Sequence, residues 1–151
     1  MTFKAAHDGP FGRLVLTEEA GAISRLTWGG VSAGNGSALL AEACRQLDEY
    51  FAGGRQGFDL RLQIETGLTG VVQRAMLAIP FGETRRYGDL ARQLGVPAQA
   101  IGQACGANPI PILVPCHRIL AADGLGGFSA PGGIETKVAL LKLEGAASLL
   151  I

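Results

Sequence analysis

The sequence has no excess of charge of either sign. Its 13 Lys and Arg balance 13 Asp and Glu, so no overall basic surplus favours binding to phosphates. It also lacks an apolar run long enough to span a bilayer, which predicts a soluble globular protein. At 151 residues it can bury one ordinary core or divide it between two small subdomains, and tandem large domains are excluded.

Cysteine is scarce and poorly spaced for cross-linking. The three residues, Cys44, Cys105 and Cys116, form an odd set without a Cys-x-x-Cys pair, which argues against a disulfide framework and a zinc ribbon. We therefore expect reduced cysteines and no bound metal, and interpret Cys44 and Cys105 as packing residues. Residues 1–8 lack the apolar stretch and cleavage site of a secretory signal, so we expect a cytoplasmic location.

The charges are unevenly distributed along the chain. Residues 1–66 carry six Lys or Arg against eight Asp or Glu, whereas residues 67–151 carry seven against five. The second part is therefore slightly basic. Imbalances of this size are common by chance on solvated surfaces, so the distribution permits DNA binding without predicting it.

Periodicity in the first part indicates a hairpin followed by a helix. Strand-like residues at 13–17 and 23–28 lie on either side of a turn-forming segment. Apolar residues then recur at helical spacing over residues 39–51, and Gly53 and Gly54 end the pattern. The sequence thus predicts an amphipathic helix after the hairpin.

The predicted fold is an α/β amino-terminal domain followed by a mainly helical carboxy-terminal domain. Alternation over residues 58–65 predicts another strand, so that residues 1–66 form a small sheet with a packed helix. Residues 67–151 form the second domain. Helical periodicity there predicts helices at 71–78, 87–94, 97–105 and 135–143.

The second and third of these helices have the spacing of a helix-turn-helix. Gly95, Val96 and Pro97 form a short turn between them, and Pro97 suits a first helical position. The following helix presents small residues with Gln99 and Gln103, which would allow close approach to a duplex. An ordinary helical hairpin is the alternative, because such hairpins are common.

The segment 108–120 is the most informative about chemistry. It brings Cys116 to a turn begun by Pro115, where helical amides and nearby cations would stabilise a thiolate. Neighbouring side chains in a helical turn point about 100° apart, so His117 would need a bridging water to act as its base. Glu144, at the end of the last helix, is the natural partner for the other His117 nitrogen. A buried inert Cys beside a structural His is the alternative.

The motif Pro115-Cys116-His117-Arg118-Ile119 resembles the active-site motif of the O6-alkylguanine-DNA alkyltransferase family. The resemblance covers residues 68–145, while the amino-terminal part is similar only in kind. The zinc ligands found in some members have no counterpart here. Further matching blocks lie at residues 79–84, 87–91, 101–104, 108–109, 126–129 and 144–145, with Lys137, Leu140 and Leu141.

The resemblance implies repair of DNA by a single-turnover enzyme, a methylated-DNA–protein-cysteine S-methyltransferase. A winged helix-turn-helix would bind the minor groove of double-stranded DNA and flip an O6-alkylguanine out of the stack. The alkyl group would then move irreversibly to Cys116, and the stable thioether would consume the protein. Such a protein needs no cofactor, no metal and no membrane, and acts as a monomer.

The resemblance also assigns catalytic roles. It implies that His117 and Glu144 activate Cys116 through water. Asn108 would brace the active-site turn, and Tyr87 would hydrogen-bond the flipped base or adjust its phosphate.

The implied binding residues fall into two groups. Those contacting the substrate are Tyr87, Ile119, Phe128 and Ser129. Those contacting DNA are Gln99, Ala100, Gln103 and Arg118, of which Arg118 would also brace the local fold.

Several positions depart from the family pattern. Gln99 stands where most members have an Arg that fills the space left by the flipped base, and Gln lacks the planar charge of Arg. Phe128 replaces a common Tyr, which keeps a stacking wall without its hydroxyl. Gln73 replaces a usual Trp, and residues 130–133 lengthen the pocket loop. These departures predict a different flipping efficiency or substrate range.

Two other functions were weighed against alkyl transfer. A non-enzymatic sensor would bind the lesion and recruit other repair factors, but relatives of that kind lack the acceptor Cys. A thiol hydrolase would need an oxyanion site, and the sequence reveals none. The presence of Cys116 therefore favours transfer over both.

Overall fold

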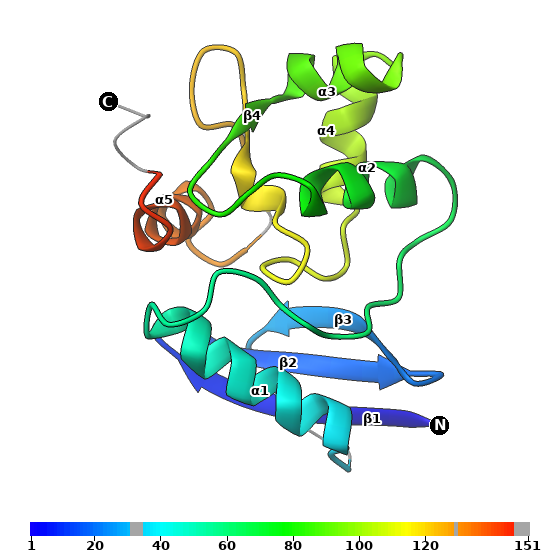
Figure 1. The fold of residues 1–151 in the computed structure, drawn as a ribbon, viewed down its shortest axis with the longest axis vertical. Helices are drawn as coiled ribbons and strands as arrows, with labels where there is room; N and C mark the ends of the chain where they lie inside the picture. The colour runs from blue at the N-terminus through cyan, green and yellow to red at the C-terminus, as the bar shows by residue number, and fades with distance from the viewer. Residues whose placement is uncertain (31–34, 129, 147–151) are drawn as a thin grey trace. The chain divides into compact units, whose positions relative to one another are not determined.

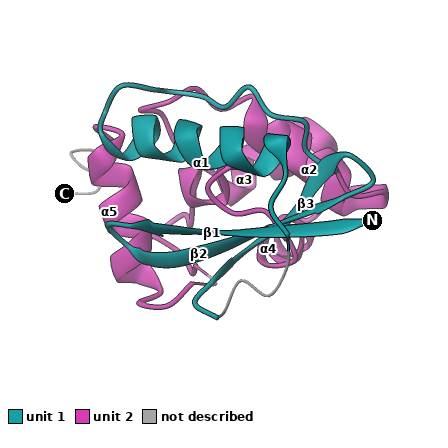
Figure 2. Ribbon diagram, turned by 90° about the horizontal axis from the view of Figure 1, so that it is seen from below, with its two compact units in different colours: residues 1–63 teal, residues 64–151 magenta. Residues whose placement is uncertain are grey.

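The computed structural model describes residues 1–30, 35–128 and 130–146. The chain divides into two compact units, Met1–Gln63 and Ile64–Ile151 (Figure 2). None of the helices within the described ranges has the length and apolar character needed to cross a membrane. The predicted domains 1–66 and 67–151 and the predicted cytoplasmic location stay predictions.

The first unit is built on a three-stranded antiparallel sheet (Figure 1). Its strands are β1 (Thr2–Gly9), β2 (Gly12–Glu19) and β3 (Ala22–Trp28), paired in that order. The predicted hairpin is confirmed as β2 and β3. Its two turn residues, Ala20 and Gly21, both have positive φ (51° and 78°), as a tight two-residue hairpin turn requires.

β1 was not predicted, and the strand predicted at residues 58–65 does not form. β1 is an edge strand whose sequence mixes polar residues with alanine, so its apolar alternation is weak. In the 58–65 segment only Leu62 forms a bridge, parallel to Ile23. The strand prediction for this segment is wrong because the alternation of apolar and polar residues does not reveal whether a partner strand is available.

The predicted amphipathic helix is confirmed as α1 (Ala38–Phe51), which packs on the sheet. Ser37 caps it, and the Ser37 hydroxyl accepts a hydrogen bond from the Leu40 amide at 3.1 Å. Leu40, Leu47 and Tyr50 are buried on its inner face. This arrangement confirms the small sheet with a packed helix.

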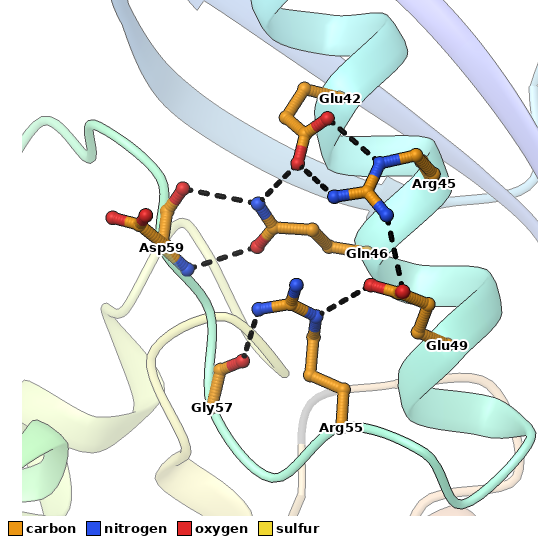
Figure 3. A network of polar contacts seen from close by, with 7 residues as sticks. All are labelled: Glu42, Arg45, Gln46, Glu49, Arg55, Gly57 and Asp59. Atoms are coloured by element: carbon orange, nitrogen blue, oxygen red, sulfur yellow. Dashed lines mark hydrogen bonds and ion pairs between the residues drawn. The ribbon is translucent and has the colours of Figure 1, made fainter.

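A polar network replaces the missing strand by attaching residues 55–59 to α1 (Figure 3). Gln46 is only 2% exposed, and its side-chain amide bonds both backbone groups of Asp59, at 3.1 and 2.9 Å. Arg55 joins Glu49 at 2.9 Å and the Gly57 carbonyl at 3.1 Å. The segment thus satisfies backbone groups through side chains instead of a strand ladder.

The second unit is mainly helical and carries the confirmed helices. Its two short strands pair in parallel, Arg85 with Ile119 and Arg86 with Leu120, which joins the start of α3 to the segment after Cys116. The elements are α2 (Gly67–Leu77), β4 (Arg85–Arg86), α3 (Tyr87–Leu94), α4 (Ala98–Gly106), the 3-10 turn η1 (Cys116–Arg118), β5 (Ile119–Leu120) and α5 (Ile134–Leu143).

Helices α3 and α4 contact each other across a short turn at residues 95–97. Gly95 ends α3 in the left-handed conformation, with φ of 69°, which glycine adopts without a side-chain penalty. Ile101 and Ala104 bury one face of α4, whereas Gln99 and Gln103 are exposed. The helix pair is therefore confirmed, and the wing of a winged helix-turn-helix stays a prediction.

Candidate active site

A cavity of about 290 Å³ lies in the second unit and contains Cys116 in its wall. The start of α3, one face of α4 and the turn η1 all contribute to it. The lining residues are Tyr87, Gly102, Cys105, Gly106, Asn108, Pro111, Cys116, Gly127 and Phe128. Four predicted site residues, from separate parts of the chain, thus meet around one space.

Asn108 organises the segment that leads to Cys116. Its Oδ1 accepts a hydrogen bond from the Ile110 amide at 3.2 Å, and its Nδ2 donates to the Val114 carbonyl at 3.1 Å. The buried Ile112 between them has a φ of 71°, which is unfavourable for a β-branched residue. Packing and the Asn108 bonds hold this turn in place, as the predicted bracing role requires.

Cys116 is the first residue of the three-residue turn η1 and is partly buried. Burial raises the pKa of its thiol, while a hydrogen bond with Asn108 and the charge of Lys137 oppose this rise. The predicted turn is present, and a backbone hydrogen bond at Cys116 and the Lys137 charge act on the thiol pKa in the expected direction. Burial outweighs the local turn and the cation, so Cys116 remains protonated at neutral pH and needs a base.

His117 has the features of that base. Its Nε2 lies 2.8 Å from Glu144 Oε2, and both side chains are completely buried. Because a carboxylate only accepts hydrogen bonds, we assign the proton to Nε2 and the lone pair to Nδ1. Burial lowers the pKa of His117, with Glu144 opposing, so the imidazole is neutral at neutral pH. Among the described residues, its Nδ1 has no hydrogen-bond partner.

Arg118 is buried and faces the same carboxylate. Its Nε and Nη2 donate to Glu144 at 2.8 and 3.0 Å, and its Nη1 donates to the Ile79 carbonyl at 2.7 Å. Its guanidinium carbon lies 5.9 Å from the centre of the Phe81 ring. We therefore correct the predicted DNA contact of Arg118, because its donors are engaged inside the protein. Its role is to brace the site.

Lys137 belongs to the site, although the sequence reading gave it no role. It is fully buried on α5, and its Nζ donates to the Ile119 carbonyl at 2.6 Å and to the Gly127 carbonyl at 3.3 Å. Burial lowers the pKa of this amine, with Cys116 and Cys105 opposing. The signal that could have identified Lys137 is a charged residue on the apolar face of the predicted helix 135–143.

Tyr87 and Phe128 line the cavity at the predicted base-binding position. Burial raises the pKa of the Tyr87 hydroxyl, which therefore keeps its proton. Gly126 has a φ of 74°, and a β-carbon there would lie 3.2 Å from the Tyr87 ring, so glycine lets this loop approach closely. The predicted substrate contact Ser129 lies outside the described residues.

The remaining predicted contacts lie near the cavity without lining it. Gln99 and Gln103 are exposed on α4 and Ala100 is partly exposed, while Gly102 and Gly106 of the same helix line the cavity. Ile119 is buried and its carbonyl accepts from Lys137, so its predicted contact would use the backbone.

Two further observations concern metals and the second thiol of the cavity. In the part of the chain that the structure describes, no group of three His, Cys, Asp or Glu side chains could hold a metal ion. Cys105 Sγ lies 3.8 Å from Met76 Sδ, and burial raises the pKa of Cys105 to about 12. A thiol of this kind is a poor nucleophile at neutral pH.

Comparisons with known proteins agree with this geometry. Residues 68–146 match the DNA-binding domain of 6-O-methylguanine DNA methyltransferase. The chain is 50% identical over 106 residues to the methylated-DNA–protein-cysteine methyltransferase of Mycobacterium bovis, a match that covers 68% of the chain and 63% of that relative. It is 42% identical over 144 residues to the protein of the same name from Mycobacterium leprae, covering 93% of the chain and 83% of the relative.

A solved structure shows the same likeness. Mycobacterium tuberculosis OGT, crystallised in complex with DNA, matches with a TM-score of 0.82 and 38% identity, over 97% of this chain and 93% of that one. The chain therefore belongs to the methylated-DNA–protein-cysteine methyltransferase family.

Proposed function

We propose that the protein repairs O6-alkylguanine in double-stranded DNA by transferring the alkyl group to Cys116. The observation that carries this proposal is Cys116 in the wall of a cavity, followed directly by a buried His117 whose Nε2 lies 2.8 Å from Glu144 Oε2. A nucleophile, a base and a carboxylate that orients the base are the parts that activation of a thiol requires.

The raised pKa of Cys116 and the lowered pKa of His117 leave a thiol with a proton to lose and an imidazole with a lone pair to accept it. A water molecule carries the Cys116 proton to the Nδ1 lone pair of His117, and Glu144 stabilises the resulting imidazolium. Arg118 holds the carboxylate in place through two hydrogen bonds. Charge develops only as the reaction proceeds, in a buried site where electrostatic interactions are strong.

The transfer is a single displacement. The Cys116 sulfur forms a bond to the alkyl carbon as the bond between that carbon and guanine O6 breaks. The electron pair of the broken carbon–oxygen bond stays on guanine, which takes up one proton. The net reaction therefore moves the thiol proton to guanine. Tyr87 keeps its own proton and donates a hydrogen bond to the flipped base. The thioether has no easy route back, so each molecule reacts once.

DNA binding is proposed for α3 and α4 as a winged helix-turn-helix in the minor groove. Gln99, Ala100 and Gln103 would lie against the duplex, and α4 would deliver the flipped base to the cavity that its other residues line. The relative crystallised with DNA supports DNA binding by this family. We propose that the protein acts as a monomer.

Mass spectrometry after incubation with an oligonucleotide containing O6-methylguanine tests the proposal. We expect the mass of one methyl group on the Cys116 peptide and none on the Cys44 or Cys105 peptides. Cys116→Ser is the matched control and should gain no methyl group. Tight lesion binding with an unmodified Cys116 would instead identify a sensor that recruits other repair factors.

A further inference from the structure

We infer that Gln73 is a positioning residue for Cys116, because it fixes the Asn108 amide that braces the turn leading to Cys116. The inference deepens the proposed function, since it takes Cys116 to be the reactive thiol. Gln73 lies on α2 and does not line the cavity. It would therefore act entirely through Asn108.

Gln73 uses both ends of its side-chain amide. It is fully buried, its Oε1 accepts from the Glu65 amide at 2.8 Å, and its Nε2 donates to Asn108 Oδ1 at 3.1 Å. The Glu65 amide can only donate, so the orientation of the Gln73 side chain is set. Gln73 must then present a donor to Asn108.

The Glu65 end of this connection is fixed by packing. A β-carbon at Gly70 would lie 1.8 Å from the Glu65 carbonyl oxygen, so the chain before α2 rests directly on the helix. Gln73 lies about one helical turn after Gly70 and bonds the same residue. Its side chain therefore extends from a rigid support toward Asn108.

At the other end, Asn108 Oδ1 receives two donors, Gln73 Nε2 and the Ile110 amide at 3.2 Å. A carbonyl oxygen has two lone pairs, so this acceptor is saturated. The Asn108 Nδ2 group is thereby directed toward the Val114 carbonyl, and the amide also hydrogen-bonds Cys116, which lowers the thiol pKa.

Hydrogen bonds in a chain polarise one another. A donor on Oδ1 draws electron density from the amide and makes its N–H groups stronger donors. Gln73 therefore strengthens the bond that favours the Cys116 thiolate and works against the effect of burial. A residue with only a packing role at position 73 would hold α2 in place without changing the titration of Cys116.

The test measures alkylation of Cys116 by iodoacetamide as a function of pH on the full chain. Gln73→Met removes both hydrogen bonds at similar volume. Gln73→Glu keeps an acceptor for the Glu65 amide but, when ionised, cannot donate to Asn108. We expect both variants to raise the midpoint of the Cys116 profile by about half to one pH unit and to slow alkylation at neutral pH about three- to tenfold. 13Cβ-cysteine NMR gives the same midpoint without a reagent.

The controls separate positioning from packing. Val72→Ala changes a buried α2 residue without a hydrogen bond to Asn108, and should leave the Cys116 profile in place. In an Asn108→Ala background, Gln73→Met should cause no further shift. The inference is overturned if Gln73→Met lowers the melting temperature while the Cys116 profile stays unchanged.

These measurements use no DNA, so they are independent of the proposed repair activity. A shifted profile in a protein that takes no methyl group from DNA would support the role of Gln73 and reject the function. Methyl transfer to Cys116, together with an unshifted Cys116 profile in the Gln73 variants, would support the function and reject the role of Gln73.

Discussion

Cys116 and His117 are held in the protonation states that carry no charge. Burial raises the pKa of the thiol and lowers that of the imidazole, so both shifts favour the neutral pair. A reactive thiolate in a resting protein would be exposed to oxidants and unrelated electrophiles. A neutral pair would confine the reaction to a substrate that fills the cavity, which would suit the single-use transfer proposed above.

His117→Gln tests the base directly. Glutamine can still donate to Glu144 but cannot accept a full proton, so we expect methyl transfer at neutral pH to slow by about 10²-fold or more. The measurement is single-turnover transfer from a methylated oligonucleotide. In the wild type, the rate should fall as pH drops through the lowered pKa of His117, because protonation fills the Nδ1 lone pair. A variant rate equal to that of the wild type would exclude His117 as the base.

Some site residues could be predicted from the sequence because they are neighbours in the chain or lie on a helix with a regular pattern. His117 follows Cys116 directly, and Glu144 ends a predicted helix. Lys137 and Gln73 were not assigned roles, because their partners are groups distant in sequence that only the fold brings near. The net rise of the Cys116 pKa could not be predicted for the same reason, since burial depends on the whole unit while the turn is local.

Helix α4 has three different surfaces. Ile101 and Ala104 pack inward, Gly102 and Cys105 line the cavity, and Gln99 is exposed. Helices with this strong periodicity could be predicted with their positions. The 58–65 segment could not, because its alternation fits a strand while its backbone bonds Gln46 of α1 at Asp59 and Ile23 of β3 at Arg61 and Gln63.

Replacing Gln99 with Arg tests the flipping role of α4. A guanidinium can fill the stack and bond the orphaned base better than an amide. We therefore expect Gln99→Arg to raise the transfer rate on duplex DNA several-fold more than on the free base O6-methylguanine. Gln103→Arg, one turn later on the same helix, adds the same charge and controls for electrostatic attraction. Equal gains on both substrates would contradict a role in flipping.

Over the whole molecule the charges cancel, and the second unit carries only a small basic excess. Two of its arginines lie in exposed ion pairs with nearby carboxylates: Arg85 pairs with Glu83, and Arg92 pairs with Asp89. Proteins that bind DNA mainly through phosphates need many free cations. This charge balance fits the proposed recognition of a lesion by base extrusion better than binding through many phosphates.

Salt dependence should reflect this charge balance. With about two phosphate contacts, affinity for a methylated duplex should fall about tenfold between 50 and 200 mM salt, compared with about 10³-fold for six or more contacts. Fluorescence anisotropy with the Cys116→Ser variant measures binding without transfer. A fall near 10³-fold would show that phosphates dominate binding.

The carboxylate of Glu144 joins His117 and Arg118 in one buried group. Neither Arg118 nor Glu144 lines the cavity, yet a change in either leaves a buried charge without its counterpart. These three positions are therefore not free to drift one at a time under mutation. Natural substitutions at these positions should therefore occur together, as a change of the whole buried group.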